Sequence, residues 1–150
     1  MYTAAHGTFG AIITVAAWSV AGPAGVVGAL PLAFLSHHVL DRFWEHPYGR
    51  FLSRQHILWD GVPILMFALA AFLSGIPWVM VSGWIAGNAM DIWDKGRSWI
   101  RYGSPFADPG FWHRHNPPKW SMSDGQTKAV AVLAGALPFV ILLVLQGAST

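Results

Sequence analysis

The sequence predicts an all-α integral membrane protein with about five short transmembrane or re-entrant helices and two polar loops on one face of the membrane. Of its 150 residues, 54% are hydrophobic and 11% are charged, whereas a typical soluble domain has roughly 25% charged residues. The 9 Lys and Arg and the 7 Asp and Glu all fall within residues 41–60 and 91–128. A soluble domain of this size has one core and would not ordinarily contain several long uncharged segments.

Five apolar stretches lie largely outside these two polar segments. Each stretch is somewhat shorter than the roughly 20 apolar residues with which a helix spans a bilayer. We therefore expect the helices to extend into flanking polar turns, to cross a thinned bilayer or to be re-entrant in part. The stretches are residues 8–21, 24–40, 57–73, 76–90 and 129–145.

Two short uncharged segments predict tight turns that pair the helices into hairpins. They are Gly22-Pro23 and Gly75-Ile76-Pro77, and proline is tolerated there because the first turn of a helix does not use its N–H group. The prediction is a single transmembrane helical domain over 1–150, with a helical hairpin over 8–40, a polar loop over 41–56, a second hairpin over 57–94, a polar loop rich in Trp, His and Pro over 95–128, and a C-terminal helix over 129–146.

The charges also predict an orientation. If all five stretches span, the N-terminus and both polar loops share one side, and the two tight turns and the C-terminus share the other. All nine Lys and Arg then lie on the first side, which the positive-inside rule places in the cytoplasm. We expect a bacterial inner (cytoplasmic) membrane protein that contacts the lipid bilayer and forms a homo-oligomer or part of a larger membrane complex. No nucleic-acid partner is expected, because membrane orientation explains the basic residues.

The chain contains no cysteine, which excludes thiol nucleophiles and thiolate zinc sites. Any metal ion would be bound by His and carboxylate side chains. Asp41 follows the second apolar stretch, four residues after His37 and three after His38, so either pair shares a helix face. Either pair could bind a divalent cation, or Asp41 could orient the imidazole without touching the metal.

A second polar pair lies at the end of the fourth apolar stretch. Asp91 and Asp94 are three residues apart, and two carboxylates this close repel each other unless a cation lies between them. Lys95, Arg97 or a metal ion could be that cation. His6, just ahead of the first helix, is a further candidate ligand on the same membrane face. The expected metal ligands are therefore His6, His37, Asp41, Asp91 and Asp94.

A third group lies in the long polar loop. His113 and His115 flank Arg114, and alternate residues diverge in an extended chain, so at most one of the two imidazoles is expected to join the same site. The loop is short enough to fold back over the helix ends.

These motifs resemble those of the membrane-bound metal-dependent hydrolase family that includes small inner-membrane proteins of the YdjM type. The resemblance implies a zinc or manganese ion that activates water for attack on a phosphoester or related bond at the level of the lipid headgroups. The similar segments are His6 with Gly7 and Gly10, the run 36–41 (SHHVLD), the run 87–94 (GNAMDIWD) and, more loosely, His113-Arg114-His115.

The resemblance also implies roles for individual residues. His113 would be a ligand or the general acid, and Arg97, Arg101 or Arg114 would bind phosphate, so that His113 and Arg114 are the expected catalytic residues. Five other residues would bind or bridge the metal: His6, His37, Asp41, Asp91 and Asp94.

A different interpretation is a non-catalytic accessory or structural subunit of a larger membrane complex. In that case His37, His38 or His56 would bind a haem or a chlorophyll, and the paired carboxylates would not be needed. A transporter is disfavoured, since the interiors of the apolar stretches contain only Ser, Thr and Asn88 as polar residues and offer no ion path.

Overall fold

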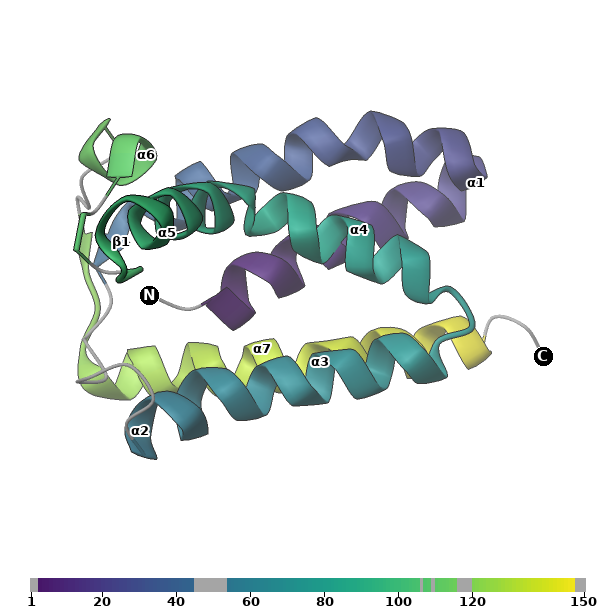
Figure 1. Cartoon of the computed structure of the whole chain (residues 1–150). Helices are drawn as coiled ribbons and strands as arrows, with labels where there is room; N and C mark the ends of the chain where they lie inside the picture. Colours follow the sequence, from purple (N-terminus) through teal and green to yellow (C-terminus); the bar gives the residue numbers. More distant parts are fainter. Residues whose placement is uncertain (1–2, 45–53, 106, 109, 116–119, 148–150) are drawn as a thin grey trace.

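The structure, a computed structural model, is built almost wholly of α-helices, which confirms the predicted all-α class (Figure 1). It describes residues 3–44, 54–105, 107–108, 110–115 and 120–147. The helices are α1 (Thr3–Leu40), α2 (Arg54–His56), the π-helix η1 (Ile57–Gly61), α3 (Val62–Leu73), α4 (Pro77–Gly87), α5 (Ala89–Tyr102), α6 (Gly110–His115) and α7 (Asp124–Gly147), and two short strands are β1 (Phe43–Trp44) and β2 (Trp120–Ser121).

Helix α1 is a helical hairpin rather than one straight rod. Gly22 has φ 56° and ψ −141°, a left-handed conformation that glycine adopts at little cost, and Pro23 starts the second arm. Gly25 lets the arms approach near the bend, because a Cβ atom there would lie 2.2 Å from Ala17 O. The two arms therefore run back alongside each other (Figure 1), as the Gly22-Pro23 turn predicted.

The second hairpin joins α3 to α4. Gly75 has φ 73° in the connecting turn, and Pro77 is the first residue of α4. Helix α4 packs mainly along α1, and α3 packs mainly along α7. Small and apolar side chains form two buried clusters between the helices. One joins α1, α3 and α4 (Ala11, Val15, Val26, Phe67, Ala71, Val79 and Met80), and the other joins α1 and α7 (Ala4, Ala5, Ala131 and Ala134).

The second polar segment contains more helix than its composition predicted. Helix α5 continues past residue 94 to Tyr102, α6 lies within the expected loop, and α7 begins at Asp124. Gly103 ends α5 in the left-handed conformation common at helix C-termini. The two polar segments are tied together by β1 and β2, which pair in parallel, and Trp120 N–H donates to Arg42 O at 2.9 Å.

Two helices are long and apolar enough to cross a membrane. They are α1 and the part of α7 over Asp124–Val144, and only 28% of the most apolar window of each is buried. Large apolar side chains are also exposed on the shorter helix α3, with Phe72 at 79% and Leu65 at 70%. Exposed apolar surface of this extent is unusual for a soluble monomer. The number of spans, about five, remains a prediction.

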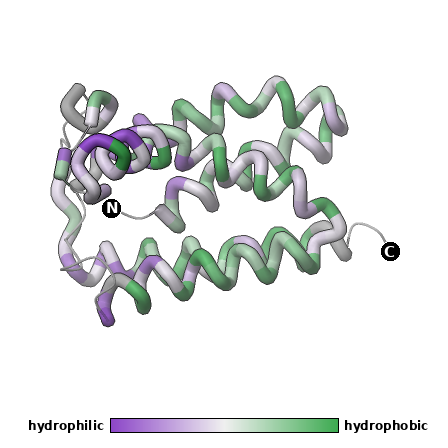
Figure 2. Tube along the Cα trace, viewed as in Figure 1, coloured by the Kyte–Doolittle hydropathy of each residue, from purple (hydrophilic) through white to green (hydrophobic). Residues whose placement is uncertain are grey.

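Polar residues gather at one end of the helices. The start of α1, β1, α5 and α6 lie at this end, and the two hairpin turns and the end of α7 lie at the other (Figure 1). Figure 2 shows that hydrophilic residues concentrate at the first end and that the rest of the helices is mostly apolar. The candidate ligands on α1 and α5 are therefore brought to one end of the fold.

Candidate metal centre

Three polar side chains from distant parts of the sequence meet in the interior near the polar end. His6 comes from the first arm of α1, His37 from the end of its second arm and Asp91 from the first turn of α5. One ligand atom of each lies within 4.8 Å of the other two. The residues are buried, with exposed fractions of 1%, 0% and 2%. This group could hold a metal ion.

Asp41, the residue after α1, borders the same group. Its Oδ1 lies 3.4 Å from His6 Nε2 and its Oδ2 lies 3.2 Å from His37 Nε2, and its side chain is only 6% exposed. The two imidazole rings stack with their centroids 4.0 Å apart and their planes at 26°. One carboxylate therefore faces the Nε2 atoms of both histidines.

The orientation of the His37 ring is fixed from its other nitrogen. His37 Nδ1 lies 2.7 Å from Gly87 O, and because a carbonyl oxygen only accepts, Nδ1 carries the hydrogen. In the neutral ring the lone pair is then on Nε2, the atom that faces Asp41. A lone pair and a carboxylate repel unless a proton or a metal ion lies between them, and a backbone carbonyl on the remote nitrogen is a usual support for a metal-binding histidine.

Glycines bring α1 and α4 close enough to form this arrangement. A Cβ atom at Gly87 would lie 2.3 Å from His6 O, and a Cβ atom at Gly10 would lie 2.1 Å from Gly83 O. Real Cβ atoms do not approach that closely, so side chains at these positions would force the helices apart. The backbone of Gly87 therefore contacts His6 on one side and His37 on the other.

The first turn of α1 is anchored to two other helices. Asp60, buried in η1 at 3% exposure, accepts the Ala4 N–H at 2.9 Å through Oδ1. Thr8 Oγ1 donates to Ala134 O of α7 at 3.0 Å. Since His6 lies between these two anchors, its position in the group does not depend on α1 alone.

Lys95 provides the positive charge beside Asp91. Its Nζ lies 3.0 Å from Asp91 Oδ1, four residues back along α5, and its side chain is 30% exposed. The sequence had left Lys95, Arg97 or a metal ion as the cation between Asp91 and Asp94, and in the structure Lys95 pairs with Asp91. An ion bound to the three ligands would therefore share Asp91 with this ammonium group.

Asp94 is buried like Asp91 but is directed elsewhere. Its Oδ1 and Oδ2 accept the backbone N–H groups of Phe111 and Trp112 at 3.1 and 3.0 Å. Gly110, at φ 85°, makes this possible because a Cβ atom there would lie 2.1 Å from Asp94 Cγ. The structure does not bring Asp94 into the group of His6, His37 and Asp91, and it shows Asp94 holding α6 against α5.

We expect an Asp94→Ala substitution to release α6 without affecting metal binding. Two partly buried N–H groups would lose their acceptor, at a cost of up to about 1–3 kcal/mol each where water does not replace it. Hydrogen exchange at the Phe111 and Trp112 amides should become faster, while the metal affinity stays at the wild-type value. A loss of metal equal to that of an Asp91→Ala variant would show instead that Asp94 is a ligand.

The expected catalytic residues lie on α6. The backbone of His113 and Arg114 belongs to that helix, but their side chains lie outside the described part of the structure, so their roles remain predictions. The two other candidate phosphate-binding residues, Arg97 and Arg101, are exposed on α5. The Arg101 guanidinium lies 5.7 Å from the centre of the Tyr102 ring.

The surroundings of His37 favour a small cation over a tetrapyrrole. A haem or chlorophyll bound through Nε2 would need a flat space on that side of the ring. Asp41 Oδ2 lies there at 3.2 Å, and the His6 ring stacks on the imidazole at 4.0 Å. His38 is half-buried beside Arg42, with 3.5 Å between Nε2 and Nη2, and the His56 side chain is outside the described residues.

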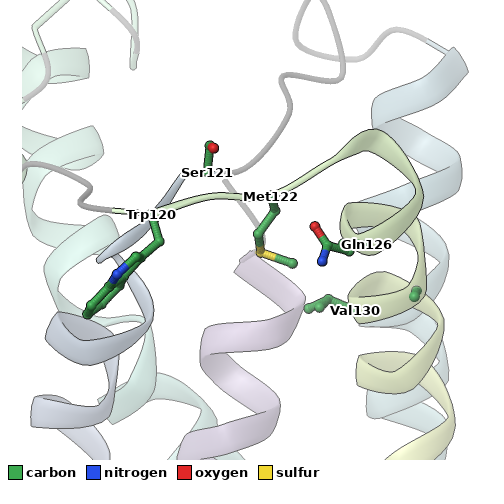
Figure 3. A pocket seen from close by; sticks show the side chains of 6 residues that line it. Trp120, Ser121, Met122, Gln126 and Val130 are labelled. Carbon is green, nitrogen blue, oxygen red and sulfur yellow. The ribbon is translucent and has the colours of Figure 1, made fainter.

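A surface pocket at the polar end is separate from the group of His6, His37 and Asp91. It is an open pocket of about 480 Å³ between β2 and the first turns of α7 (Figure 3). None of its lining residues is titratable or belongs to the histidine and aspartate group, so it has no obvious role in acid–base chemistry. It is lined by Trp120, Ser121, Met122, Gln126, Ala129 and Val130.

Sequence reasoning missed two supports of the site. Gly87 was part of a matched motif, but its contacts with both histidines were not expected; the four-residue spacing of Gly83 and Gly87, typical of close helix packing, is the signal that could have indicated them. No local signal indicates that Asp60 accepts the N–H of Ala4, because 56 residues separate the two.

A comparison of the chain with protein-family models, with curated proteins and with solved structures finds no match.

Proposed function

We propose that this chain is a membrane-embedded metal-dependent hydrolase with its metal site at the cytoplasmic face. The observation that carries the proposal is the buried group of His6, His37 and Asp91, with Asp41 beside it. Paired carboxylates and imidazoles are costly to bury without a cation. Their concentration at the polar end of an otherwise apolar protein favours a functional role over a structural one.

The donor set fits a catalytic metal ion. Two imidazoles and one carboxylate are the protein ligands of several catalytic zinc sites, which keep a further position for water or substrate. A zinc or manganese ion held there would supply a nucleophilic water at neutral pH and would polarise the bond to be cleaved. Asp41 could be a fourth ligand or could accept a proton from that water, since its oxygens face both Nε2 atoms.

The position of the group favours a substrate at the membrane surface. The ligands come from helix ends: His6 from the start of α1, His37 from its end and Asp91 from the first turn of α5. This end of the fold, where hydrophilic residues gather (Figure 2), is at the depth of the lipid headgroups if α1 and α7 span. Lys95 forms an ion pair with Asp91 of the group and is partly exposed, so it could bind an anionic group of the substrate. We therefore propose phosphoesters, including those of lipid headgroups, as the substrate class.

The test is hydrolysis by the purified, metal-loaded full chain. Mixed micelles of detergent with phosphatidylglycerol and phosphatidylethanolamine, and p-nitrophenyl phosphate as a soluble substrate, should be cleaved in the presence of zinc or manganese. An Asp91→Asn variant should lose at least about 100-fold in rate, because a metal ligand is removed. Asp124→Asn is the matched control, since Asp124 is an exposed carboxylate paired with Lys128 on α7.

Metal-loaded protein that cleaves neither substrate, or an Asp91→Asn variant as active as the Asp124→Asn control, would contradict the proposal. Inactive protein that co-purifies with other membrane proteins, or that shows a Soret band, would support an accessory subunit instead.

A further inference from the structure

Two buried polar atoms beside the metal group have no hydrogen-bond partner among the residues that the structure describes. One is His6 Nδ1 and the other is Asn88 Oδ1, and their residues are 1% and 0% exposed. Buried nitrogen and oxygen atoms are nearly always hydrogen-bonded in native proteins, so each exception calls for an explanation. His6 Nδ1 can donate a hydrogen bond when it carries the ring hydrogen, whereas Asn88 Oδ1 can only accept one.

Asn88 lies at the junction of α4 and α5, directly beside the part of α1 that carries His6. Its φ and ψ of −103° and 4° depart from helical values, and its Nδ2 donates to Trp84 O at 3.0 Å. A Cβ atom on Gly7 would lie 2.5 Å from that Nδ2. The Asn88 amide is therefore packed against the residue that follows His6.

The chemistry of a bound histidine determines what Nδ1 needs. If His6 binds a metal ion through Nε2, which faces Asp41, the neutral ring carries its hydrogen on Nδ1. That N–H then requires an acceptor in a buried environment. His37 already has one, since its Nδ1 donates to Gly87 O at 2.7 Å.

We propose that Asn88 is a positioning residue for the metal centre: its Oδ1 accepts the Nδ1–H of His6 when a metal ion is bound through Nε2. The two atoms form no hydrogen bond in this structure, and the bond is expected to form when a metal ion binds. Adjacent residues, Gly87 and Asn88, then orient the two histidine ligands from one helix junction. The inference rests on the metal centre of the proposed function and identifies Asn88 as the residue that supports its second histidine, His6.

A competing donor is Trp84 Nε1, which is also buried without a hydrogen-bond partner among the described residues. A Cβ atom on Gly7 would lie 2.1 Å from it, so it is close to the same amide. An amide oxygen has two lone pairs and can accept from both donors. The experiment must therefore distinguish a role toward His6 from a role toward Trp84 alone.

The test compares zinc affinity and the visible spectrum of the cobalt-substituted full chain in Asn88 variants. Asn88→Leu removes the acceptor at similar size, and should weaken zinc binding by about 10–100-fold and alter the cobalt bands. Asn88→Asp keeps an acceptor and should restore both. Thr14→Val is the matched control, because it removes a hydrogen bond to Val79 O across the same helix pair, at 3.0 Å, away from the ligands.

A second measurement needs no substitution. In the zinc-loaded wild type, nitrogen-15 NMR should show two slowly exchanging imidazole N–H signals, from His6 and His37. Only one such signal, or an Asn88→Leu variant that loses stability but keeps wild-type zinc affinity and an unchanged cobalt spectrum, would overturn the inference and assign Asn88 Oδ1 to Trp84. Those results would leave the proposed metal centre intact. A wild-type protein that binds no zinc would instead refute both the metal centre and the role of Asn88.

Discussion

A His37→Ala substitution is expected to weaken metal binding by more than about 100-fold, beyond the 10–100-fold typical of residues that only support a ligand. His37 is fully buried, its Nδ1 donates to Gly87 O, and its Nε2 faces Asp41 at 3.2 Å. Its removal takes away one ligand and leaves Asp41 facing a cavity. The measurement is competition for zinc against a chromophoric chelator, on protein purified in detergent without a histidine tag.

The neighbouring histidine provides the control. His38 is only half-buried and has Arg42 Nη2 at 3.5 Å from its Nε2. A His38→Ala variant changes the same residue type at the adjacent position, and should bind zinc like the wild type. Equal losses in the two variants would mean that the end of α1, rather than the His37 ligand, was disturbed.

A Gly87→Ala substitution is expected to destabilise the protein by about 3 kcal/mol, the upper end of the range for overpacked cores. The new Cβ atom would lie 2.3 Å from His6 O and 3.2 Å from Gly10 Cα, both backbone atoms that cannot rotate away. Helices α1 and α4 would have to separate, which would also lengthen the hydrogen bond from His37 to Gly87 O. Thermal unfolding in detergent and zinc affinity should therefore both decrease.

Gly28→Ala is the matched control, because it is the same substitution within a helix at a glycine that no neighbouring residue approaches. Nothing lies within 4 Å of a Cβ atom built at Gly28 in α1, and alanine is favoured over glycine inside a helix by roughly 0.5–1 kcal/mol. This variant should be at least as stable as the wild type and should bind zinc normally. A Gly87→Ala protein as stable as Gly28→Ala would refute the close packing of α1 on α4.

Local patterns in the sequence were sufficient to predict much of the helical organisation. The glycine and proline turns predicted both hairpins, since Gly22 and Gly75 adopt positive φ values at the bends. The spacing predicted that Asp41 shares a helix face with His37 or with His38, and in the structure it is His37 whose Nε2 lies 3.2 Å from Asp41 Oδ2.

Contacts between distant segments could not be predicted in the same way. Asp91 and Asp94 are equivalent by spacing and residue type, yet Asp91 meets His6 and His37 whereas Asp94 accepts two N–H groups from α6. A rotation of about 60° around a helix separates residues three apart, so the choice depends on which neighbour packs on each side. That packing depends on Gly110 and on how the polar segment folds. The sequence of that segment has no hydrophobic periodicity from which its packing could be predicted.

The most direct test of the metal centre is the metal content of this chain, purified gently in detergent from its natural source without a histidine tag. We expect close to one zinc or manganese ion per chain, lost in His37→Ala and in Asp91→Asn and retained in His38→Ala. The metal centre would be refuted by protein that contains no metal and does not bind added zinc or manganese, or by a His37→Ala, Asp91→Asn double variant that keeps its metal.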